Sequence, residues 1–137
     1  MRRLPSFAAP LIAHIDDDPT FGGPYTQTSA ALSSFLPYVE SLQHDGFIEF
    51  GMIYRRAGIT EEVRVASTKH FKIWTNHGDA AQAALVEFGL SKVDTLTFID
   101  EYPRVTEAIA GAPTANTVVS AVVESFAALP SAEKPPH

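Results

Sequence analysis

The chain contains no cysteine among its 137 residues. It therefore cannot form disulfides, use a thiol nucleophile, or hold zinc or an iron–sulfur cluster through cysteine. A cysteine-free chain suits a reducing compartment. Two arginines precede a short apolar run near the N-terminus, but Pro10 and His14 interrupt it and no convincing cleavage site follows. We therefore expect a cytoplasmic protein.

The chain also lacks long apolar runs and an excess of positive charge. No stretch approaches the ~20 apolar residues of a transmembrane helix, so we expect no membrane span. The net charge is −6, from 16 acidic and 10 basic side chains. This balance disfavours nucleic acid as a partner, since a nucleic-acid-binding domain usually carries a basic face. It also disfavours binding to an anionic membrane surface.

Sequence motifs for catalysis are absent. The chain has no G-x-S-x-G, no glycine-rich phosphate loop, no H-E-x-x-H and no dinucleotide fingerprint. We therefore expect no cofactor, and a non-enzymatic protein is favoured over an enzyme.

The length predicts one domain with an ordinary hydrophobic core. We assign residues 1–129 to a single α+β domain whose first 25 residues are rich in loops. The segment "PLIAHI" is expected to form at most a short edge strand. Residues 130–137 carry three prolines and no large apolar side chain, so we expect a flexible tail.

Apolar periodicity predicts three main helices. Steps of three and four residues indicate a helix over 26–44, which Pro37 must kink or restart because proline lacks the N–H of the helical ladder. The segment 79–88 has Asp79 at the expected N-cap and Gly89 at the residue after the C-cap. A short helix is also expected near 104–110, and the final helix is predicted to start near Thr114 or Asn116.

Alternation of apolar and polar residues predicts the strands. It indicates one strand over 47–56, extended chain over 62–75, and another strand over 93–100. Whether 62–75 is one bent strand or two strands around "STKH" is left open by the pattern. The order is roughly α-β-β(-β)-α-β-α, which predicts a mostly antiparallel sheet of three to five strands with helices packed on one face. The last predicted strand could also follow 71–75 through a parallel crossover.

The segment "HFKIWTNHGD" places His70 and His77 close to Asp79 in sequence. An extended chain separates two residues seven positions apart by roughly 23 Å, so the histidines cannot share one metal ion. The helix-start signals favour a structural junction between a strand and a helix, and we expect no metal site.

A second group of residues offers a pocket for a small ligand. His14 and Asp16 lie in an acidic turn, Asp100 lies at the inward end of a predicted strand, and Arg104 can pair with it. A solvated turn and a salt bridge at the sheet rim explain the same residues. The pocket is kept as the alternative.

Half of the lysines and arginines lie between positions 55 and 72. Strand alternation places several of them, with the single tryptophan, on the sheet face opposite Val63 and Phe71. This mixed basic and aromatic face comprises Arg55, Arg64, His70, Lys72 and Trp74. Arg and Trp are enriched in protein interfaces. The C-terminal helix could instead cover the face.

These observations favour a non-enzymatic interaction or assembly protein, whose partner is another protein or a second copy of itself. The alternative is a small-ligand-binding protein or enzyme with a pocket near the N-terminal loop and the end of strand 95–100.

Deleting residues 130–137 is expected to leave the melting temperature unchanged, because this segment has nothing to bury. Differential scanning calorimetry of the full and shortened chains measures the effect. A fall of several degrees would mean that the tail docks on the domain.

Overall fold

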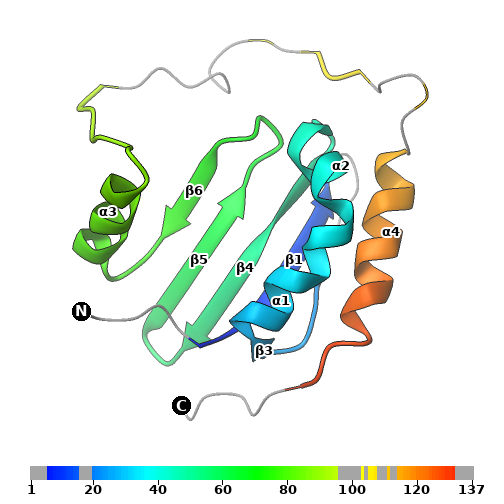
Figure 1. Ribbon diagram of the computed structural model, residues 1–137, viewed down its shortest axis with the longest axis horizontal. Coiled ribbons are helices and arrows are strands. Elements are labelled where there is room, and N and C mark those ends of the chain that lie inside the picture. The colour runs from blue at the N-terminus through cyan, green and yellow to red at the C-terminus, as the bar shows by residue number, and fades with distance from the viewer. Residues whose placement is uncertain are drawn as a thin grey trace.

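The computed structural model describes residues 6–15, 20–95, 103, 105–107, 111 and 114–131 (Figure 1). The elements in chain order are β1 (Phe7–His14), β2 (Phe21–Gly22), β3 (Thr26–Gln27), α1 (Thr28–Phe35), the 3₁₀ turn η1 (Leu36–Tyr38), α2 (Val39–His44), β4 (Ile48–Arg56), β5 (Ile59–Val65), β6 (Phe71–Trp74), α3 (Gly78–Glu87) and α4 (Ala115–Phe126).

The strands form one antiparallel sheet in the order β2-β1-β4-β5-β6, and β3 also pairs with β1. The α+β class and the antiparallel sheet were correctly predicted. In the part of the chain that the structure describes, the sheet has six strands rather than three to five, because the N-terminal segment that was expected to be rich in loops contributes β1, β2 and β3.

Strand β1 is eight residues long and lies inside the sheet, so the expectation of a short edge strand was wrong. Pro10 misled the prediction, since proline is rare in interior strands. The Pro10 carbonyl accepts a hydrogen bond from Gly23 N–H at 2.9 Å, on the side facing β2. The N–H and C=O of one residue in a strand point the same way, so the missing N–H also falls on that side. The ladder between β1 and β4 is undisturbed.

Helices α1, α2 and α4 lie over the part of the sheet formed by β1 and β4 (Figure 1). Ile12 and Ile48 are fully buried and meet Leu42 of α2 and Val122 of α4 in one cluster. Helix α4 therefore packs on the face that carries Ile12. No helix in the described ranges is long and apolar enough to cross a bilayer.

The helix covering 26–44 breaks at Pro37, as predicted, and restarts through η1. Helix α4 is capped by Thr114, whose hydroxyl accepts from Thr117 N–H at 3.3 Å.

The N-cap of helix α3 lies two residues earlier than predicted. Its N-cap is His77 and no side chain caps it, so Asp79 lies in the first turn rather than at the cap. Its end agrees with the prediction: Gly89 has φ +81°, and Leu90 N–H donates to Leu85 O at 3.1 Å. This is the Schellman pattern.

The chain over 62–75 forms two strands, which resolves the alternative left open by the sequence. Lys69 adopts φ +63° between them. Residues 96–100 of the last predicted strand lie outside the described residues, while 93–95 are described and are not in a strand. Of the helix predicted near 104–110, residues 105–107 are described and are not helical, and the others lie outside the described residues. Of the tail, only residues 130 and 131 are described.

Gly51 lies in the middle of β4, where a Cβ would collide with the carbonyl oxygen of Val63 and lie 2.8 Å from Cα of Arg64. Gly51→Ala is expected to destabilise the protein by about 3 kcal/mol, because neighbouring backbone cannot yield cheaply. A Cβ on Gly78 meets nothing within 4 Å. The matched Gly78→Ala variant is expected to be neutral or slightly stabilising in urea denaturation, and equal losses would contradict this packing.

Candidate functional site

Strand β6 lies at one end of the sheet and pairs only with β5 among the described residues. All four of its residues are exposed, with 65% exposure for Phe71, 38% for Ile73 and 72% for Trp74. An edge strand presents unpaired N–H and C=O groups, and natural edges usually carry charges or proline to prevent pairing. Here the edge carries one lysine, Lys72, between large apolar side chains.

Strand pairing places Trp74 opposite Glu62 and Lys72 opposite Arg64. Residues directly opposite one another point to the same side of a sheet. Trp74, Lys72 and Arg64 therefore share the face that lies away from the helical core, and alternation along β4 adds Arg55. We call this side the outer face. Because α4 packs on the opposite face, it does not cover Trp74.

The outer face is less basic than expected. Arg64 Nε lies 2.8 Å from Glu62 Oε1, and Arg64 Nη1 lies 3.8 Å from Glu49 Oε2. The arginine charge is thus partly compensated within the chain. The grouping of Glu62 with Arg64 was missed, although two residues apart on one strand is the spacing that puts side chains on the same face. Glu49 could not be placed without the register.

His70 was also predicted to belong to this face, but it is less exposed than the residues of β6. Its Nδ1 lies 2.6 Å from the hydroxyl of Thr68, and the side chain is half-buried at the turn before β6. It helps to shape the turn that orients β6.

Lys69 makes a contact that sequence reasoning missed. Its ammonium donates a 2.8 Å hydrogen bond to the carbonyl of Ile48 at the start of β4, and lies 6.0 Å from the centroid of the Phe50 ring. Burial lowers the pKa of the Lys69 ammonium, and the nearby carboxylates of Asp45 and Glu49 oppose that shift. The left-handed turn at Lys69 is therefore tied to the body of the sheet, and it fixes where β6 starts.

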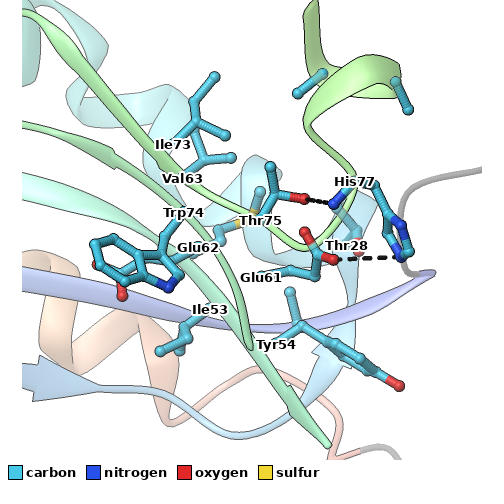
Figure 2. Close-up of a pocket in the computed structure, with 14 residues that line it drawn as sticks. Thr28, Ile53, Tyr54, Glu61, Glu62, Val63, Ile73, Trp74, Thr75 and His77 are labelled. Atoms are coloured by element: carbon cyan, nitrogen blue, oxygen red, sulfur yellow. Dashed lines mark hydrogen bonds and ion pairs between the residues drawn. The ribbon is translucent and has the colours of Figure 1, made fainter. Parts of the chain in front are cut away.

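A small hollow lies on the helix side of the sheet near β6 (Figure 2). Met52, Val63 and Ile73 line it from the strands, Thr28 lines it from α1, and Ala80 and Ala81 line it from α3. Figure 2 shows the Trp74 indole on the same side as Ile53, pointing away from Val63 and Ile73. Val63 and Ile73 are each 38% exposed, so the helical layer does not close over this end of the sheet.

His77 lies at the rim of this hollow. Its Nε2 is 3.5 Å from Glu61 Oε1, and its backbone N–H donates to the Thr75 hydroxyl at 2.9 Å (Figure 2). The contact with Glu61 joins the start of α3 to β5, and the contact with Thr75 lies within the connection from β6 to α3, which agrees with the structural junction expected from the sequence. No group of three histidine, aspartate or glutamate side chains suited to a metal ion is found in the part of the chain that the structure describes.

Helix α3 has no buried residue. Phe88 just after it is 86% exposed, and Val86 is 57% exposed. The apolar surface at the β6 end of the molecule thus extends onto α3.

Of the four residues predicted to form the alternative pocket, the structure describes His14 alone. His14 stacks on Phe47 with ring centroids 5.5 Å apart, and it borders a hollow between α2 and the start of α4 that also contains His44 and Glu107. Asp16, Asp100 and Arg104 lie outside the described residues, so the predicted grouping of these residues with His14 is not tested. Stacking on Phe47 gives His14 a structural role.

We compared the chain with models of known protein families, with curated proteins and with solved structures, and none matches it.

Lys69→Ala is expected to destabilise the protein by about 1–2 kcal/mol, because it removes a charge-assisted hydrogen bond to Ile48. Lys69→Gly loses the same bond but relieves the positive φ, so it should be more stable than Lys69→Ala by about 1 kcal/mol. Urea denaturation of both variants measures the difference, with Lys92→Ala as the exposed lysine control. Equal stability of the alanine and glycine variants would show that the turn is not strained.

Proposed function

We propose that this protein works by self-association through the exposed edge strand β6 and the outer-face residues Trp74 and Lys72 that it carries. The observation that carries the proposal is the 72% exposure of Trp74 on a strand whose outer edge pairs with no other described strand. The function is assembly rather than catalysis.

The energetic argument starts from Trp74. Burying a large aromatic removes on the order of 150–250 Å² from water, which at ~25 cal/mol per Å² is several kcal/mol before ordering costs. Phe71 and Ile73 add apolar area on the same strand. A folded chain gains nothing from holding these side chains in water, whereas an interface gains from covering them.

A second copy of the chain is favoured over an unrelated partner because the surface is self-complementary. The edge of β6 offers hydrogen-bond groups that another β6 matches. The outer face carries both charge signs, with Arg64 and Lys72 near Glu49 and Glu62. Two such faces can align opposite charges in a symmetric interface, where the same patch is used by both copies.

The chain has a single tryptophan, so its fluorescence reports on this surface alone. We expect static light scattering to show a reversible increase of mass with concentration, in the micromolar range. Dilution should shift the Trp74 emission to the red as the indole returns to water.

Trp74→Ala is expected to weaken self-association by at least tenfold, equivalent to ~1.4 kcal/mol, while the fold survives. The matched control is Phe21→Ala, which removes an exposed aromatic from β2 at the opposite end of the sheet. A monomer at every concentration would reject the proposal. So would a loss of 3 kcal/mol or more of folding stability in Trp74→Ala with no effect on association.

A further inference from the structure

We infer that two copies pair antiparallel through β6 with Ile73 on the two-fold axis, so that the sheets of both copies become one continuous sheet. This inference rests on the proposed self-association and adds its geometry. It names which residues of the two copies lie opposite each other.

Symmetry restricts the pairing strongly. A two-fold axis perpendicular to the sheet keeps each face of one copy on the same side as that face of the other. Directly opposite residues point to the same side, so one residue must lie opposite its own copy on the axis. Strand β6 has four residues. Two registers place three of them opposite residues of the second β6, one centred on Lys72 and the other centred on Ile73.

The register centred on Lys72 is electrostatically unfavourable. Arg64 lies opposite Lys72 within each chain. Placing Lys72 opposite its own copy would line up Arg64, Lys72, Lys72 of the second copy and Arg64 of the second copy in one row on the outer face. Like charges directly opposite one another destabilise a sheet. This register also leaves Trp74 opposite His70, which lies before the start of β6.

The register centred on Ile73 removes this conflict. On the outer face, Trp74 lies opposite Lys72 of the second copy, and the arrangement occurs twice because of the symmetry. A lysine beside an indole is a favourable cation–π pairing. Glu62 is the cross-strand neighbour of Trp74 within the chain, so each row reads acidic, aromatic, basic, basic rather than four cations.

The helix side of the sheet favours the same register. Met52 lies opposite Val63, and Val63 lies opposite Ile73. With Ile73 on the axis, this row continues into Ile73, Val63 and Met52 of the second copy. The half-exposed side chains of Val63 and Ile73, each 38% exposed, then form an uninterrupted apolar row across both copies. The end of the sheet formed by β6, next to the hollow that these residues line, then lies in the middle of the sheet shared by the two copies.

The absence of native cysteine allows a direct test by disulfide formation in single-cysteine variants of the full chain. A disulfide needs Cβ atoms roughly 3.5–4.5 Å apart, which directly opposite residues approach and residues displaced by two positions do not. Ile73→Cys alone should form a covalent dimer under mild oxidation, about tenfold faster than Phe71→Cys alone.

Two mixtures of single-cysteine variants supply matched readouts. Both mixtures keep Lys72 and Trp74, and the first also keeps Ile73. A mixture of Phe71→Cys and Thr75→Cys proteins should give the mixed disulfide, because these positions are opposite in the register centred on Ile73. A mixture of Phe71→Cys and Ile73→Cys should give mainly the Ile73→Cys homodimer. The first mixture keeps the test valid even if Ile73→Cys folds poorly.

The outcomes separate the inference from the function on which it rests. A monomer in light scattering rejects both. A dimer whose mixed Phe71→Cys and Ile73→Cys disulfide dominates keeps self-association and overturns this register in favour of the one centred on Lys72. A dimer that forms none of these disulfides overturns pairing through β6.

Discussion

The long ladder between β1 and β4 is the interaction on which the rest of the structure depends. It joins the N-terminal strand to a strand 34 to 44 positions later, from His14 opposite Ile48 to Ala9 opposite Ile53. The pairing puts Ile12 and Ile48 on the same face of the sheet, two register positions apart, and both are fully buried. The chain between the two strands must then return across the same face, which places α1 and α2 over the ladder. Helix α4 completes the cover with Val118 and Val122.

This arrangement has a consequence for the other half of the sheet. Strands β5 and β6 are added to β4 by antiparallel pairing between neighbours in sequence, so they need no helix to hold them in place. The helical layer ends before it reaches them, and β6 with α3 is left without a buried side chain. Elements with few buried contacts have the lowest local stability. Burial by a second copy, as proposed above, would stabilise such an edge without a larger core.

Local features of this fold were predictable from the sequence, and long-range ones were not. Alternation identified β4, β5 and β6, Pro37 marked the break between α1 and α2, and Gly89 marked the end of α3, because each signal depends on residues close together in sequence. The interior position of β1 was missed, since Pro10 is compatible with it only when its carbonyl side faces β2. Asp79 failed as a cap because the helix starts one residue before it.

The candidate site shows the same division. The side of the sheet on which Trp74 and Lys72 lie followed from alternation, but the carboxylates that compensate Arg64 depended on a register that alternation does not give. The contact of Lys69 with the carbonyl of Ile48 crosses from one turn to the start of another strand, and no local pattern encodes it.

In the proposed assembly, Lys72 reconciles an exposed apolar edge with one defined pairing. A lysine in the middle of an edge strand ordinarily discourages pairing, and here it lies opposite Arg64, so a second cation in the same row is costly. That cost does not fall equally on all pairings. It is greatest when two Lys72 residues meet and disappears when Lys72 meets Trp74. In the dimer proposed here, the side chain that prevents indiscriminate edge-to-edge contact would therefore also select one register, and the aromatic residue two positions later would supply the attraction that stabilises it.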